Sequence, residues 1–499
     1  MADASDYSPM AADLLRLRAR EHGDRVPFTV GAEPGPSYAE WDRRSDRVAA
    51  ALARAGHGRG DRIALLFGGM DWTDYAIAYA GVLKTGATAV HLPATLGAAD
   101  LADRLGECGA GDAVVGAGVT PPDGVTVHTV AGLTAAGTGF APTVAVAPHD
   151  IADILYTSGT TGRPKAFTNP HGALTYGRGP AALASFDGSA PLLAPMPLGT
   201  PSSASTVGML ALTTTSAVVI CPVDDVELMA ALTARFGVVS LMLTPWTAIR
   251  LANARVHERH DLSSVRRLAL ASAALPPAVA RRLTAMMPGL LISTAYAQGE
   301  AAPAVVLSTY DPDRPLCVGR PGPGTELRVV GPGGDPAPTG EIWLRCQAPK
   351  RLYLDEARNR EIHAGGWTRT RDLGRLAADG RLELIDRAAD ALPTPSGWLS
   401  TLEVEHAAYE HPGVVEATAY GGTGGDGAPW LRIAVVLAPG HAVDGPGGVA
   451  EVVGGQLPAD APPWRVERHE RLPRGITGKV LKHVLRDGTR AVTSGGAHV

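Results

Sequence analysis

The chain has 499 residues, far too many for one hydrophobic core, so we expect two or three domains. Hydrophobic residues make up 45% of it and charged residues 19%, proportions that are typical of a globular protein and exclude a disordered one. A formal net charge of −5 and the lack of a lysine and arginine run disfavour nucleic acid as a partner, and no apolar stretch is long enough to span a membrane.

The first residues and the cysteines bear on the cellular compartment. The N-terminal segment lacks the basic start and apolar stretch of a secretion signal. The cysteines lie far apart without a CxxC pair, so they predict neither a zinc site nor a disulfide framework. We therefore expect a cytoplasmic protein.

The predicted elements of the first three quarters of the chain alternate between strand and helix. Residues 38–115 combine helix-like segments such as WDRRSDRVAAALARAG with short apolar runs such as RIALLF. The alternation resumes after a Gly- and Thr-rich segment and continues through VVSLMLTP and LPPAVARRLTAMM. This pattern predicts a large α/β domain of mostly parallel sheets with helices.

The pattern changes twice toward the C-terminus. Short strand-like segments with turn residues predict a β-rich subdomain at about residues 317–385, which closes a large N-terminal domain of residues 1–385. The remaining segment contains the helix-like STLEVEHAAYEHP and the strand-like LRIAVVLAP. It predicts a small α+β domain at residues 391–499, joined through residues 386–390.

A Gly- and Thr-rich loop, YTSGTTGRPK at residues 156–165, follows the strand-like residues 151–155. Glycines let the backbone approach phosphate oxygens, hydroxyl and amide groups donate hydrogen bonds, and Lys165 adds a positive charge. The spacing differs from that of a Walker loop. A phosphate-binding loop is predicted; taken alone, the pattern also fits a surface turn.

Further motifs follow in the order GEIWLR (340–345), GGWTRTRDLGRL (365–376) and GITGKVLKHVLR (475–486). With the Gly/Thr loop, they make almost the whole chain resemble the adenylate-forming superfamily of acyl-CoA synthetases, nonribosomal-peptide adenylation domains and luciferases. The resemblance implies an enzyme that uses ATP and Mg²⁺ to activate an acid as its AMP ester with release of pyrophosphate. It also implies a mobile C-terminal domain that turns about a hinge at Asp390.

The resemblance assigns roles to individual residues. Nucleotide binding is implied for Thr157, Ser158, Gly159, Thr160, Thr161, Gly162, Lys165, Tyr296, Asp372 and Arg387. Tyr296 would stack on adenine, Asp372 would accept hydrogen bonds from the ribose hydroxyls, and Arg387 would contact the nucleotide, although an exposed salt bridge is an alternative for Arg387. Glu300 would hold Mg²⁺ and act in catalysis, since a carboxylate suits this ion.

The resemblance also implies that Lys479 is the second catalytic residue, because it matches the lysine that reaches the acid substrate and the α-phosphate during adenylation. The sequence has only five lysines, so each retained lysine is expected to need its own chemistry. As a carboxylate attacks the α-phosphorus, negative charge accumulates on the phosphoryl oxygens, and a mobile ammonium can neutralise it.

The chain departs from the family pattern around the nucleotide and in the acid pocket. Ala297 and Gly299 replace a glycine and a threonine, and Arg371 replaces a glycine. Where relatives place an aromatic or histidine gate, this chain has the small, polar stretch that includes Thr200 and Ser202. Those hydroxyls either bind the substrate or cap the backbone.

The acceptor is also open, because Pro395-Ser396 replaces the Gly-Gly pair that lines the pantetheine tunnel of acyl-CoA synthetases, and proline fixes φ and lacks an N–H. We therefore slightly favour an amine acceptor, in specialised metabolism, over CoA. An acyl- or aryl-CoA ligase, a nitrite-activating ligase, a separate carrier protein as acceptor and a non-catalytic nucleotide-binding protein are the alternatives, and the protein is expected to be a monomer or homodimer.

Overall fold

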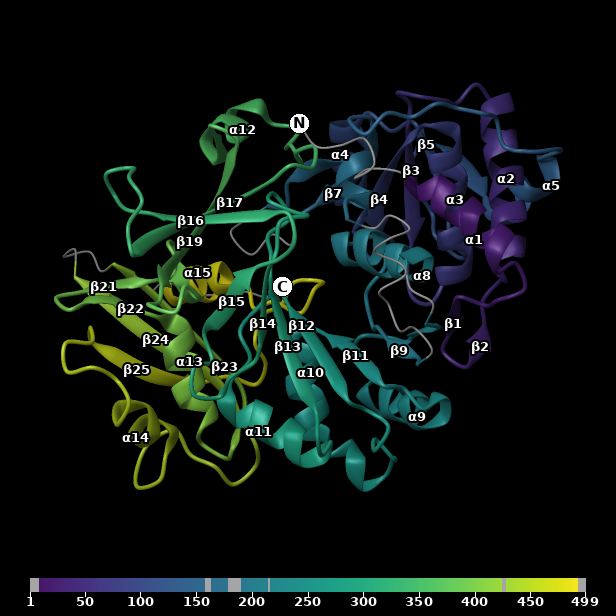
Figure 1. The fold of residues 1–499 in the computed structure, drawn as a ribbon. Helices are drawn as coiled ribbons and strands as arrows, with labels where there is room; N and C mark the ends of the chain where they lie inside the picture. The colour runs from purple at the N-terminus through teal and green to yellow at the C-terminus, as the bar shows by residue number, and fades with distance from the viewer. Residues whose placement is uncertain (1–8, 158–162, 178–189, 214–215, 424–427, 492–499) are drawn as a thin grey trace.

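The structure is a computed structural model that describes residues 9–157, 163–177, 190–213, 216–423 and 428–491 (Figure 1). Within these ranges the strands form three larger sheets and a two-stranded hairpin. No helix in the described ranges is long and apolar enough to cross a membrane.

The first sheet has six strands in the order β6-β5-β3-β4-β7-β8, all parallel except β8. Helices cover both of its faces, so its apolar runs are buried, as is usual for parallel sheets. The strands are β3 (Arg62–Phe67), β4 (Thr88–Pro93), β5 (Asp112–Val115), β6 (Thr126–Thr129), β7 (Ile151–Tyr156) and β8 (Ala166–Pro170). The helices are α1 (Ala11–Glu21), α2 (Tyr38–Arg54), α3 (Trp72–Thr85), α4 (Ala98–Cys108), α5 (Val130–Ala136) and α6 (His171–Thr175).

Helix α2 illustrates how local sequence sets these elements. The Ser37 hydroxyl accepts a hydrogen bond from the Glu40 backbone N–H at 3.3 Å, which caps the first turn. Trp41, Val48 and Leu52 then recur on one face of the helix and are buried. The helix forms where capping and apolar periodicity agree.

The second sheet is long and changes character along its width. Its order is β16-β17-β19-β20-β15-β14-β13-β12-β11-β9-β10-β1-β2, with β18 paired to β19. The strands are β1 (Phe28–Val30), β2 (Glu33–Pro34), β9 (Leu192–Leu193), β10 (Val218–Ile220), β11 (Ser240–Leu243), β12 (Arg267–Ala271), β13 (Leu291–Tyr296), β14 (Val306–Thr309), β15 (Cys317–Pro321), β16 (Thr325–Val330), β17 (Thr339–Cys346), β18 (His363–Ala364), β19 (Trp367–Leu376) and β20 (Leu382–Arg387). Strands β9 to β13 pair in parallel and β14 onward pair antiparallel, so the β-rich segment continues the parallel sheet through β14 and β15.

The helical segments of this part of the chain are the π-helix η2 (Ser203–Gly208), α8 (Met209–Thr213), α9 (Val226–Phe236), α10 (Pro245–Ala254), the 3₁₀ turn η3 (Val256–Glu258), α11 (Pro277–Met286) and α12 (Glu356–Ile362). Buried residues of α9, α10 and α11 pack against β11, β12 and β13.

The C-terminal unit is built on the sheet β23-β24-β25. Its elements are β21 (Leu392–Thr394), β22 (Gly397–Leu399), α13 (Thr401–Tyr409), β23 (Val414–Thr423), β24 (Pro429–Leu437), α14 (Val449–Gly454), β25 (Trp464–Arg468) and α15 (Lys482–Ala491). It packs against α10 and α11, where the Asn253 amide donates to the Val415 carbonyl at 2.9 Å and Arg281 pairs with Glu410 at 2.5 Å. The predicted α/β fold with a smaller α+β C-terminal unit is confirmed.

Candidate functional site

The phosphate loop leaves the first sheet at the end of β7. The Thr157 backbone N–H donates to the Lys165 carbonyl at 3.0 Å, and the Lys165 backbone N–H donates to the Thr157 hydroxyl at 3.1 Å, so these two residues close the base of the loop. Ser158, Gly159, Thr160, Thr161 and Gly162 lie outside the described residues. Burial lowers the pKa of Lys165, as do the charges of Arg358 and Arg371.

Asp372 lies where β13, β19 and β20 meet. The Tyr296 hydroxyl and the Gln298 amide both donate to its Oδ2, at 2.8 and 2.7 Å. Its other oxygen faces the Arg387 guanidinium, with 4.0 Å between Oδ1 and Nε. Burial raises the pKa of the Asp372 carboxyl, and Arg387 and the two donors oppose this rise. Oδ2 is thus held by protein donors, while Oδ1 lies on the side of Arg387.

Tyr296, Asp372 and Arg387 are therefore brought together as the sequence analysis supposed. The Tyr296 hydroxyl also has a role that the sequence did not indicate, since it fixes the Asp372 side chain. Gln298, which occupies a position without an assigned role in the motif, does the same. The pairing of β19 with β20 places Asp372 opposite Arg387, while Tyr296 comes from the end of β13.

Glu300 accepts a hydrogen bond on its Oε1 from the hydroxyl of Tyr353. Tyr353 follows β17 and packs edge-on against Phe167, with ring centroids 6.4 Å apart. Burial and the neighbouring Glu300 carboxylate raise the pKa of Tyr353, so its hydroxyl remains a donor. Tyr353 is a site residue that sequence reasoning missed, because nothing in KRLYLDE marks that tyrosine.

A buried polar chain reaches the same loop from the first sheet. The Arg351 guanidinium donates to the Gly299 carbonyl at 3.2 Å and to the Asn169 side-chain oxygen at 2.8 Å. Asn169 in turn donates to Asp153 at 2.8 Å, and His91 contacts the other oxygen of Asp153 at 3.1 Å. The chain ties the backbone next to Glu300 to strands β4, β7 and β8, and sequence reasoning missed all of it.

Lys479 lies beside this cluster although it comes from the far end of the chain. Burial and the charge of Arg387 lower the pKa of Lys479 to about 8, while Asp372 and Glu300 act in the opposite direction. No ion pair of its ammonium within 4.0 Å is found in the part of the chain that the structure describes. The charges of both carboxylates thus act on the ammonium, for which no direct ion-pair partner is found among the described residues.

Packing of Gly478 against Trp246 holds Lys479 in this place. Gly478 has a φ of +79°, and a β-carbon there would lie 2.4 Å from the Trp246 ring. Arg474 donates to the Gly478 carbonyl at 2.5 Å and lies over the Trp246 ring at 5.5 Å from its centroid. Since Trp246 belongs to α10, these contacts fix the lysine turn to the large second sheet.

Asp390, the predicted hinge residue, is held by α15. The Arg486 guanidinium donates to its Oδ1. Burial alone would raise the pKa of Asp390, but Lys482 and Arg486 more than offset this and lower it. Lys482 also pairs with Glu405 at 3.0 Å, so the segment next to the hinge carries a partly buried ionic cluster.

The two candidate substrate residues differ in their surroundings. The Thr200 hydroxyl donates to the Pro197 carbonyl at 2.8 Å and accepts from the Ser203 backbone N–H at 3.3 Å. Thr200 thus caps the backbone, which is one of the two roles expected for these hydroxyls. The Ser202 side chain is partly exposed. The neighbouring Gly199 has a φ of +75°, and a β-carbon there would lie 2.2 Å from Pro93, which explains the small residue at the gate.

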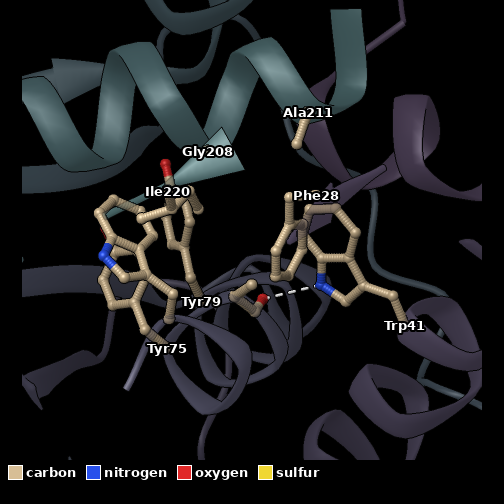
Figure 2. A pocket seen from close by; sticks show the side chains of 9 residues that line it. Phe28, Trp41, Tyr75, Tyr79, Gly208, Ala211 and Ile220 are labelled. Carbon is tan, nitrogen blue, oxygen red and sulfur yellow. Dashed lines mark hydrogen bonds between the residues drawn. The ribbon is translucent and has the colours of Figure 1, made fainter. Parts of the chain in front are cut away.

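An open cavity of about 520 Å³ lies along β12, β13 and β14. Its lining side chains are small or of moderate size: Ala269, Leu270, Ser293, Thr294, Ala295, Leu307, Ser308 and Thr309. A second, aromatic pocket between α2, α3 and α8 has a volume of only about 20 Å³ (Figure 2). Because that volume admits little more than one water, the aromatic pocket is a gap in the core.

Comparisons with known proteins identify the family and the fold of the chain. The family model described as "AMP-binding enzyme" matches residues 15–354. A feruloyl-CoA synthase of Amycolatopsis sp. is 28% identical over 90% of this chain and 93% of its own length. An anthranilate CoA ligase solved with anthranoyl-AMP superposes with a TM-score of 0.86 at 21% identity, covering 99% of this chain and all of its own.

The amide bond synthetase of Marinactinospora thermotolerans superposes with a TM-score of 0.81 at 24% identity, over 96% of this chain and 99% of that one. These two structural likenesses concern the fold, while the family match covers the segment that holds the phosphate loop, Glu300 and Tyr353. The chain therefore belongs to the AMP-binding enzyme family, and it is an ATP-dependent, AMP-forming ligase.

Proposed function

We propose that this enzyme activates a small acid as its AMP ester at the cluster of Glu300, Asp372, Arg387 and Lys479 and then transfers the acyl group to an amine. The observation that carries the first half of the proposal is the position of Lys479, whose ammonium lies near Asp372 and Glu300 without a direct ion-pair partner among the described residues. Such a cation suits the charge that develops during adenylation.

In the first step a carboxylate oxygen of the acid attacks the α-phosphorus of ATP. The bond from that phosphorus to the bridging oxygen of the β-phosphate breaks, and pyrophosphate leaves. Lys479 faces the oxygens that gain charge, Asp372 accepts from the ribose through Oδ1, and Thr157 and Lys165 support the loop around the leaving phosphates. Tyr296 would lie along the adenine.

Glu300 fits a role as ligand for Mg²⁺. Its Oε1 accepts the hydrogen bond from Tyr353, and no partner of its Oε2 is found among the described residues. A carboxylate with one oxygen oriented by a donor, and with no partner for the other found among the described residues, is a suitable ligand for this hard cation, which would neutralise charge on the triphosphate.

The second step is the attack of an amine nitrogen on the carbonyl carbon of the adenylate, with loss of AMP and of a proton from nitrogen. We propose that residues 391–499 form the small domain and that they turn about residues 386–390 between the two steps. Pro395 and Ser396 form the turn of the β21–β22 hairpin, and Asp460 accepts from the Ser396 N–H at 2.9 Å. A pinned turn of this kind differs from a flexible Gly-Gly wall and supports a non-CoA acceptor.

Transfer to CoA is the second candidate, because two similar proteins are named as a feruloyl-CoA synthase and an anthranilate CoA ligase. The open cavity along β12 to β14, with a volume of about 520 Å³ and lining side chains that are small or of moderate size, supports an acid larger than acetate in either case. Ser202 is the proposed contact to the acid at the gate. We further propose that any carrier-protein acceptor is a separate chain.

A pyrophosphate-release screen tests the proposal. Aliphatic, aromatic and inorganic acids, nitrite among them, are each incubated with ATP and Mg²⁺, alone, with CoA, with hydroxylamine and with aryl and alkyl amines. The proposal predicts an amide by mass spectrometry and little thioester. Rapid formation of an acyl-CoA, with no amide from any amine, would replace the amine by CoA as the acceptor and leave the adenylation step standing.

A further inference from the structure

Three potential metal ligands converge on the first sheet, away from the adenylation cluster. Asp112 begins β5, His128 lies in the edge strand β6, and His57 follows the end of α2. Asp112 lies at the amino end of its strand, whereas the phosphate loop follows the carboxyl end of β7, and these strands run parallel. Asp112 thus lies at the opposite end of the strands from the phosphate loop, with His57 and His128 beside it, and β5 and α15 lie far apart in Figure 1.

The donor atoms are spaced like ligands of one ion. The Nε2 atoms of His57 and His128 lie 3.3 and 3.0 Å from the same oxygen, Oδ1 of Asp112. All three donor atoms lie within 4.8 Å of one another. Zinc bonds of about 2.0–2.2 Å in a tetrahedron place neighbouring ligand atoms about 3.3–3.6 Å apart, so small rotations of the side chains are enough to admit an ion.

The site is also rigid and accessible. Asp112 is on a paired strand, and His128 lies opposite Val114 in the β5–β6 register, so the backbone holds both on one face. The two imidazole rings are nearly perpendicular, at 86°, with centroids 6.3 Å apart, so that both can point a nitrogen at one centre. Between 17% and 23% of each side chain is exposed, which leaves a path for an ion and a place for water.

We propose that His57, Asp112 and His128 bind one divalent transition-metal ion, with Zn²⁺ as the representative, and that water completes its coordination. Two imidazoles and a carboxylate form a ligand set that such ions favour. In the bound state each imidazole carries its proton on Nδ1. The ion joins the α2–β3 connection and the edge strand β6 to β5, and so stabilises this edge of the sheet. No local motif in the sequence marks this site, because its two nitrogen ligands are 71 residues apart in the chain.

The test uses the full chain without a histidine tag, freed of metal by a chelator. Zn²⁺ is titrated calorimetrically, and Co²⁺ serves as the visible-absorption probe that Zn²⁺ displaces. We expect one ion per chain, with affinity at least about 10–100-fold weaker in His57→Ala and in His128→Ala. His257→Ala, which removes an exposed histidine elsewhere, should bind like the wild type.

Stability provides a second measurement that does not depend on catalysis. Saturating Zn²⁺ should raise the Tm of the wild type and of His257→Ala but not that of His57→Ala/His128→Ala, whose fold is checked by circular dichroism. Failure of the wild type to bind Zn²⁺ would overturn the proposal. Equal binding by the double variant would do so too, since the ion would then lie elsewhere, for example at a free cysteine.

Discussion

The five lysines of the chain have clearly different surroundings. Lys84 is fully buried between two helices, where Asp42 and Asp46 lie 2.6 and 2.7 Å from its ammonium. Lys482 is paired with Glu405. Lys479 has no such partner among the described residues and a lowered pKa. Scarcity singled out the lysines as a group, but only the surroundings separate a structural ammonium from the proposed catalytic one.

Replacement of Lys479 by Met should change activity and stability in opposite directions. Pyrophosphate release should fall at least about 100-fold, because the cation that faces the transition state is lost. Burial lowers the pKa of Lys479 from 10.5 to about 8, so its charge lowers the free energy of unfolding by about 3 kcal/mol at neutral pH. Met carries no charge, and the variant should therefore be more stable.

Steady-state pyrophosphate assays and urea unfolding measure the two effects. Arg471→Ala, which removes an exposed cation of the same C-terminal unit, is the control and should change neither quantity. A variant that lost activity and also became less stable would contradict a desolvated ammonium that has no ion-pair partner among the described residues.

The pH dependence of kcat/KM follows from the same group. The active form of Lys479 is the protonated one, which predominates below its pKa of about 8 in the free enzyme. We expect kcat/KM for pyrophosphate release to fall about tenfold per pH unit above pH 8. In Lys479→Arg the guanidinium stays charged, so the residual activity should not show this decline. A wild-type profile that stays level to about pH 9.5 would rule out the assignment.

Arg371 carries strain that glycine would remove. Its φ is +59°, a left-handed value that costs a residue with a β-carbon about 1 kcal/mol. The ion pair it gains with Glu361, at 2.8 Å, is exposed and contributes little. We expect Arg371→Gly to raise the free energy of unfolding by about 0.5–1 kcal/mol in urea titrations. Arg371→Ala, which keeps the β-carbon and loses the ion pair, should not be stabilised.

At the scale of elements, the turn before α15 matters most for the site. Gly478→Ala would place a methyl group 2.4 Å from the Trp246 ring, so the turn would have to move and carry Lys479 with it. We expect pyrophosphate release to fall by at least about tenfold, because small displacements of a catalytic group have large effects on rate.

Gly440→Ala is the matched control for this substitution. Gly440 has a φ of +84°, close to that of Gly478, but a β-carbon there meets nothing within 4 Å. The control therefore has the same backbone strain without the clash and should keep its activity. Equal losses in the two variants would assign the effect to strain alone.

Elements with strong local signals were predictable. The apolar runs became β3 and β4, and the amphipathic stretch became α2, because burial, capping and periodicity act over neighbouring residues. Gly199 and Arg371 show the limit. Both have positive φ values, and Gly199 lies close to Pro93 while the Arg371 N–H donates to Glu341, contacts with other elements that no local pattern reports.

At the scale of the molecule, we expect the packing of the C-terminal unit against α10 and α11 to set the position of Lys479. Asn253 donates to Val415 at 2.9 Å and accepts from Arg282 at 2.8 Å, far along α10 from the Lys479 turn. Asn253→Ala should therefore weaken the packing of the C-terminal unit on α10 by about 1–2 kcal/mol. It should lower kcat/KM for pyrophosphate release roughly five- to thirtyfold.

The control is His257→Ala, an exposed change in the next turn of chain, which should leave kcat/KM unaltered. Measurement of KM for ATP and of the free energy of unfolding distinguishes weaker packing of the C-terminal unit on α10 from a general loss of stability. An unchanged kcat/KM in Asn253→Ala would show that this contact does not govern the position of Lys479.

The sequence by itself determined the family resemblance, the α/β fold and the residues expected around the nucleotide, because these depend on motifs of a few adjacent residues and on local periodicity. The tertiary structure alone decided which groups complete the site: Tyr353 and Gln298 beside Glu300 and Asp372, and the Arg351 chain that reaches the first sheet. It also brought His57, Asp112 and His128 together. Such contacts join residues that are distant in sequence, and strand order and the packing of the C-terminal unit bring them together, which no local pattern encodes.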